Sequence, residues 1–127
     1  MTVEQLVPHL ATVNIEDVLL ALRAGPRRQA DPFHPERIAF SDAVSRAIFG
    51  DSRSRAFPEL RALAFWLPRA AVVRLAERFH ALESCGIFRV PRGLAFHVPP
   101  ANVDTLFVYS LMASLLVGNL NLVRVSR

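Results

Sequence analysis

The chain has 127 residues, of which 52% are hydrophobic and 20% are charged, so it fits one ordinary domain and is too apolar for intrinsic disorder. Five glycines and one cysteine exclude collagen-like and disulfide-scaffold proteins. Fifteen arginines and no lysine, against eleven acidic residues, give a net charge of +4. The arginines are spread along the chain rather than clustered, so we expect no nucleic-acid partner.

The compartment is predicted from the same features. The single cysteine suits a reducing environment, and no secretory signal begins the chain. The most apolar stretch, residues 93–123, is interrupted by prolines, glycine and asparagines, so its unbroken part falls short of the ~20 residues of a membrane span. We therefore expect a cytoplasmic protein without a transmembrane segment.

Residues 1–90 are predicted to be helical. Asn14 can cap a first helix that runs through Leu22, and the proline-containing residues 25–35 are typical of a loop. A second helix is expected over residues 41–49, ended by Gly50. Its apolar stripe would be formed by Ala43, Val44, Ala47 and Ile48.

Two further helices are expected around Pro68. Pro58 suits the first turn of a helix that runs through Leu67, and a fourth helix follows over residues 69–83. The inward side chains would be Leu60, Leu63, Ala64 and Leu67 in the third helix, and Val72, Leu75, Ala76, Phe79 and Leu82 in the fourth.

The pattern changes after residue 90. Residues 94–98 and 120–125 are short apolar runs typical of strands, and Asp104 or Thr105 can cap a helix between them that ends at Gly118-Asn119. This βαβ order predicts a parallel sheet with a right-handed crossover, hence an α/β fold with a helical region (1–90) and the start of a Rossmann-like nucleotide-binding domain (91–127). Because two parallel strands rarely form a sheet alone, the sequence is expected to be truncated.

The loop Pro99-Pro100-Ala101-Asn102 follows the first of these strands and precedes a helix. Open α/β sheets bind anionic ligands at this edge, although no G-x-G-x-x-G fingerprint is present. On the residues alone, a rigid loop with a capping amide is the more common explanation.

The cysteine and histidines are expected to be structural. Cys85 is predicted to be a small helix-end or core residue, and His97 a buried histidine with its hydrogen bonds satisfied. The other histidines, His9, His34 and His80, lack metal-ligand spacing, so no metal site is predicted.

Two linked motifs carry a family resemblance. The first is P-R-G-L-A-F-H-V-P-P-A-N at residues 91–102, and the second is G-N-L-N-L-V-R-V-S at residues 118–126. Their order and spacing resemble the cofactor-binding stretch of the aldehyde dehydrogenase superfamily. Within it, the chain looks most similar to the long-chain acyl-CoA reductase family, which includes the fatty-acid reductases of bacterial bioluminescence.

The resemblance implies site residues. Asn102 would be catalytic, because its amide would donate to the oxyanion of a thiohemiacetal. Pro99, Pro100 and Ala101 would lie along the nicotinamide nucleotide. Arg124, where most aldehyde dehydrogenases have lysine, would meet the adenosine end together with Ser126 and would favour NADPH through its 2′-phosphate.

The resemblance also implies the N-terminal part of an NADPH-dependent acyl-CoA reductase that produces a fatty aldehyde through a cysteine thioester. That cysteine would lie outside this chain, because Cys85 does not align with it, and the chain alone is expected to be inactive. The expected partners are acyl-CoA or another acyl-thioester and the remainder of the enzyme or a complementary chain, and a homo-oligomer is compatible with this. The alternative is a small helical interaction module without catalytic activity, whose apolar C-terminal third docks on a partner.

Overall fold

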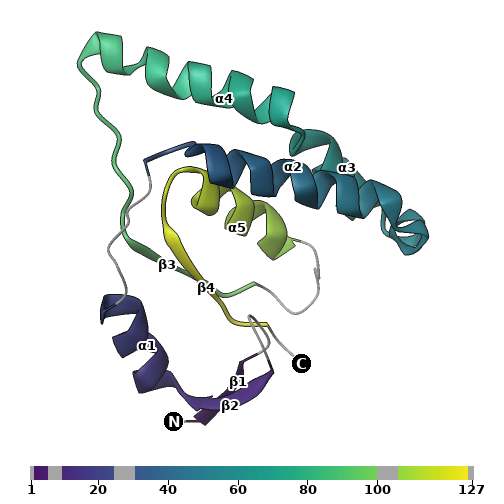
Figure 1. The fold of residues 1–127 in the computed structure, drawn as a ribbon, viewed down its shortest axis with the longest axis vertical. Coiled ribbons are helices and arrows are strands. Elements are labelled where there is room, and N and C mark those ends of the chain that lie inside the picture. Colours follow the sequence, from purple (N-terminus) through teal and green to yellow (C-terminus); the bar gives the residue numbers. More distant parts are fainter. Residues whose placement is uncertain (1, 6–9, 25–30, 100–105, 126–127) are drawn as a thin grey trace.

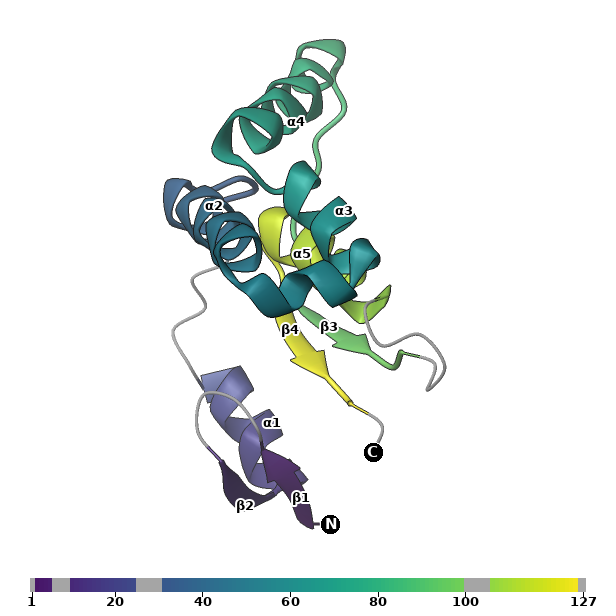
Figure 2. The same cartoon turned by 90° about the vertical axis from the view of Figure 1, so that its right-hand side faces the viewer.

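The computed structural model describes residues 2–5, 10–24, 31–99 and 106–125. In chain order, its strands and helices are β1 (Thr2–Gln5), β2 (Ala11–Asn14), α1 (Ile15–Ala24), α2 (Pro35–Gly50), α3 (Pro58–Trp66), α4 (Arg69–Ala81), β3 (Leu94–His97), α5 (Leu106–Leu116) and β4 (Leu120–Val123). Two short 3₁₀ helices, η1 (Ser52–Ala56) and η2 (Glu83–Cys85), follow α2 and α4. Helix α5 lies between the α2–α3 pair and the β3–β4 pair, and both views show this layering (Figures 1 and 2).

The N-terminal region is not purely helical, so that prediction is wrong. Strands β1 and β2 pair antiparallel, with Thr2 opposite Asn14 and Gln5 opposite Ala11. Each strand has only four residues, and such short strands form only when they pair. The apolar periodicity of one segment does not reveal a pairing with another segment. The predicted cap is confirmed, because the backbone N–H of Glu16 donates to Asn14 Oδ1 at 3.1 Å.

Helix α2 begins at Pro35 rather than at the predicted Ser41. Pro35 occupies the first turn, where its missing N–H costs nothing, and His34 Nδ1 accepts from the backbone N–H of Glu36 at 3.4 Å. Pro35, which the sequence predicts to be part of the preceding loop, therefore starts the helix.

The predicted inward stripe of α2 is also partly wrong. Ala43 and Ala47 are exposed, whereas Ser41 and Ser45 are buried. The Ser45 hydroxyl donates to the carbonyl of Ala64 at 2.7 Å, and the Ser41 hydroxyl donates to the carbonyl of Leu67 at 2.9 Å. Apolar periodicity does not detect these serines, because their burial depends on acceptors in another helix.

Pro68 explains why α3 needs these donors. In a continuing helix the carbonyl of Ala64 would accept from the N–H of residue 68, but proline has none. The Ser45 hydroxyl takes its place. On the other side of Pro68, the carboxylate of Asp42 accepts from the backbone N–H of Arg69 at 3.0 Å and so caps α4. Helix α2 thus satisfies both sides of the α3–α4 break.

In the part of the chain that the structure describes, the core consists of two buried clusters that each combine helices distant in sequence. Ile38, Val72 and Leu116 join α2, α4 and α5. The second cluster joins α3 and the residue after it to α5 through Leu63, Leu67 and Met112. The predicted inward positions Leu63, Ala64, Leu67 and Val72 are confirmed as buried, while Leu60, Leu75, Ala76, Phe79 and Leu82 are half-buried.

Strands β3 and β4 pair in parallel, as predicted, with Leu94 opposite Leu120 and His97 opposite Val123. Both strands end earlier than predicted, at His97 and Val123. The predicted helix between them is confirmed as α5, but the expected caps Asp104 and Thr105 lie outside the described residues. The fold is thus mixed and mostly helical, with a small parallel sheet. Among the described helices, none is long and apolar enough to cross a membrane.

Candidate functional site

The carboxyl ends of β3 and β4 meet at one edge of the sheet. The backbone N–H of Arg124 donates to the carbonyl of His97 at 2.9 Å, so the parallel pairing continues to the point where both strands end. Pro99 is half-buried two residues beyond β3, and Arg124 is exposed directly after β4. The structure therefore places these two predicted site residues at the same edge. Pro100, Ala101, Asn102 and Ser126 lie outside the described residues.

The electrostatics of this edge suit an anion. In a βαβ unit the helix begins where the first strand ends, so α5 directs its amino end, the positive end of its dipole, toward the carboxyl edge. Arg124, directly after the neighbouring strand β4, adds a basic side chain. An exposed guanidinium at this position can bind a phosphate through paired hydrogen bonds.

His97 joins all three elements of the βαβ unit. It is half-buried on β3, where its Nδ1 lies 2.6 Å from the Ser110 hydroxyl of α5 and its Nε2 lies 2.9 Å from Asn121 Oδ1 of β4. Because an amide oxygen only accepts, Nε2 donates to Asn121 Oδ1, and Nδ1 lies within hydrogen-bond distance of the Ser110 hydroxyl. Both ring nitrogens have partners, which confirms the prediction of a satisfied histidine and gives it a structural role.

Asn119 is a second junction, at the opposite edge of the sheet. Its side-chain oxygen accepts from the backbone N–H of Arg92 at 2.7 Å, and its amide donates to the Ser114 hydroxyl at 3.2 Å. The preceding Gly118 has a φ of 101°, which favours glycine and ends α5 as predicted. The Gly-Asn pair of the second motif thus turns the chain and ties the start of β4 to the segment before β3.

Sequence reasoning missed how the carboxyl end of α5 is capped. The Arg37 guanidinium of α2 donates to the carbonyls of Leu115 and Asn119, and the backbone N–H of Phe33 donates to the carbonyl of Leu116. Burial lowers the pKa of Arg37 from its usual range. A cation at the negative end of a helix is stabilising. Arg37 lies nearly eighty residues before the carboxyl end of α5, so the sequence around α5 contains no signal for this cap.

Other candidate groups lie away from this edge. Cys85 is an exposed thiol at the end of η2, outside the βαβ unit, in agreement with its predicted helix-end position. Within the described ranges, no three of the histidine, cysteine and acidic side chains are grouped so as to hold a metal ion.

The comparisons with known proteins address the same part of the chain. A family model described as Acyl-CoA reductase (LuxC) matches residues 71–127, which include α4 and the whole β3–α5–β4 unit. No curated protein and no solved structure matches the chain significantly. The match confirms the resemblance that the two motifs carry. Residues 71–127 of this chain are therefore similar to the acyl-CoA reductase (LuxC) family, which is consistent with a fragment of a protein of that type.

Proposed function

We propose that this chain supplies the start of the nucleotide-binding sheet of an NADPH-dependent acyl-CoA reductase that makes fatty aldehydes. The observation that carries the proposal is the shared carboxyl edge of β3 and β4, with Pro99 and Arg124 on it, inside the segment that matches the family. NADPH would supply the hydride. The residues at this edge would bind and orient it.

The described residues suit this cofactor. Arg124 is exposed, so its guanidinium is accessible to a 2′-phosphate, and the amino end of α5 favours the pyrophosphate charge. The backbone N–H of Arg124 donates to the carbonyl of His97, and this hydrogen bond fixes the backbone from which the Arg124 side chain extends. Pro99, which lacks an N–H and has a restricted φ, gives this edge a rigid border.

The test is a comparison of two arginines in the protein that carries this segment together with its catalytic cysteine. Arg124→Ala should raise KM for NADPH far more than KM for NADH, because the loss of one charge-assisted pair costs about 1.5–3 kcal/mol. Arg92→Ala is the matched control, since Arg92 is also exposed but lies before β3, at the opposite edge. Equal effects of Arg124→Ala on both cofactors would refute the 2′-phosphate role.

Asn102 is proposed as the oxyanion donor on the loop after β3. Asn102→Ala should lower kcat by about 10²–10³, while KM for NADPH and the melting temperature stay unchanged. A large fall in melting temperature with normal turnover by the folded fraction would instead identify Asn102 as a structural loop residue.

The nucleophilic cysteine is proposed to lie outside these residues. Residues 1–127 alone should then show no acyl-CoA-dependent oxidation of NADPH. Such oxidation, if it survived Cys85→Ser, would refute that part of the proposal.

A further inference from the structure

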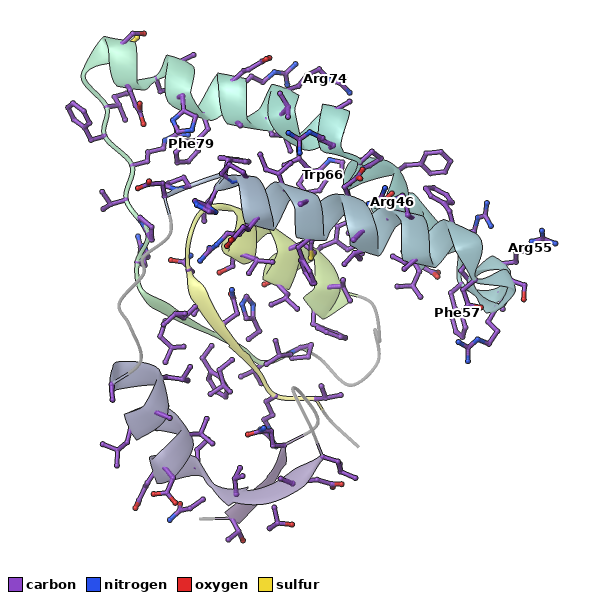
Figure 3. The ribbon with its side chains drawn as sticks, viewed as in Figure 1. Arg46, Arg55, Phe57, Trp66, Arg74 and Phe79 are labelled. Carbon is purple, nitrogen blue, oxygen red and sulfur yellow. The ribbon has the colours of Figure 1, made fainter. Side chains whose placement is uncertain are left out.

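An apolar groove of about 380 Å³ lies between α4 and the carboxyl-terminal half of α5, away from the edge described above. Its lining residues are Phe33, Trp66, Leu75, Arg78, Phe79, Leu82, Arg89, Ala113, Leu116 and Val117. Phe33 and Phe79 meet edge to face across it, with ring centroids 5.3 Å apart. The side chains of Trp66 and Phe79 point into the space between α4 and the helices below it (Figure 3).

The groove has the features of a helix-binding surface. Leu75 and Phe79 on α4 and Leu82 directly after it follow the spacing that a helix uses for packing, yet all three are only half-buried. Trp66 is 44% exposed although it lines the groove. Tryptophan and arginine side chains in an open apolar groove are typical of the central contacts of protein interfaces.

The charges of the groove select the partner. Among the described residues that line it, the charged ones are Arg78 and Arg89, both exposed, and none is acidic. The guanidinium of Arg89 lies over the Phe79 ring, 5.1 Å from its centroid, so this cation is held beside the apolar floor. Glu77 lies two residues after Leu75 and thus on the other side of a helix with about 3.6 residues per turn.

We propose that this groove docks an amphipathic α-helix of a partner protein, with an apolar stripe on the groove floor and acidic side chains beside Arg78 and Arg89. Helix-in-groove recognition uses apolar anchors one turn apart, and the α4–α5 gap offers apolar surface along both flanking helices. Acidic residues on the partner helix would pair with the two arginines and fix its orientation. This inference does not depend on the proposed reductase function.

The experiment uses residues 1–127 and their single tryptophan, Trp66, whose fluorescence reports directly on the groove. The probe is a synthetic helical peptide of about four turns with leucines one turn apart and flanking glutamates. It should change Trp66 emission saturably, and the same peptide with lysines for glutamates should bind at least about tenfold more weakly.

Variants test the two parts of the groove. The double variant Arg78→Glu with Arg89→Glu should weaken binding of the glutamate peptide by roughly tenfold or more. Arg55→Glu is the matched control, because Arg55 is an exposed arginine on η1 at the far end of the molecule (Figure 3), and it should leave binding unchanged. Ala113→Phe introduces a large side chain at an exposed position that lines the groove and should abolish binding, with circular dichroism confirming that the fold is kept.

Three results would overturn the proposal. Equal binding of the two peptides would remove the acidic requirement. Saturable binding of dodecanoate, with no response to either peptide, would identify a site for small amphiphiles. A change in Trp66 emission that depends on protein concentration in the absence of peptide, together with dimers in analytical ultracentrifugation, would show that a second copy of the chain covers the groove.

Discussion

Two buried serines allow a direct test of how the α3–α4 break is stabilised. Ser45 and Ser54 are 3% and 6% exposed, so replacing either with alanine removes a buried hydroxyl. Ser45 donates to Ala64, whereas the Ser54 hydroxyl has no hydrogen-bond partner within the described part of the chain. Ser45→Ala leaves the Ala64 carbonyl without a donor, since Pro68 has no N–H, and should cost about 1–2 kcal/mol of unfolding free energy. Ser54→Ala removes an unpaired polar atom and should be neutral or stabilising by up to about 1 kcal/mol.

The assay is urea denaturation of the wild-type chain and the two variants. A lower midpoint at an unchanged m-value would attribute the effect of Ser45→Ala to stability rather than to a change in the unfolded ensemble. Ser45→Thr, which keeps the hydroxyl, tests whether the donor itself is responsible. Equal destabilisation by Ser45→Ala and Ser54→Ala would refute the reasoning, because both variants remove the same atom and differ only in its partner.

Two further predictions concern acid stability and backbone conformation. Hydrogen bonds from Arg53 hold the pKa of Asp51 below its usual range. This carboxylate therefore stabilises the fold above pH about 4, and the stabilisation is lost as the pH falls further. Asp51→Asn should reduce the difference in urea midpoint between pH 6 and pH 3. Gly118→Ala, at a φ of 101°, should lower the unfolding free energy by about 1–2 kcal/mol. Gly50→Ala, with open space around the added methyl, should be neutral or slightly stabilising in thermal melts. Similar effects of the two variants on the melting temperature would contradict the role of backbone conformation.

The elements that the sequence predicts best are those that depend on neighbouring residues. Pro58 at the start of α3, Gly118 at the end of α5 and the apolar runs of β3 and β4 are local signals, and the structure confirms them. The β1–β2 hairpin and the buried serines of α2 depend on partners elsewhere in the chain. Apolar periodicity predicts burial from hydrophobicity alone. It therefore predicts Ala43 and Ala47 on the buried face of α2, where the structure has Ser41 and Ser45.

The candidate site divides in the same way. The parallel pairing of β3 and β4 was predicted, and it places Pro99 and Arg124 at one edge because both strands end there. The sequence does not predict the polar contacts of Ser110 and Asn121 with His97 on this sheet, or the Arg37 cap at the carboxyl end of α5, near the opposite edge. Each is an ordinary polar residue whose role arises only when the sheet and helices are assembled.

The capping of α5 by Arg37 has a consequence for how the molecule unfolds. The family-matching segment begins at residue 71, yet the cation on its helix and two of the three members of the Leu63–Leu67–Met112 cluster come from earlier residues. Expressed alone, residues 71–127 would expose Met112 and Leu116 and lose the donor at the start of β4. Residues 31–70 therefore act as an intramolecular scaffold for residues 71–127. Calorimetry should record one cooperative transition for both parts, with amide exchange in α2 and α5 slowed to the same extent.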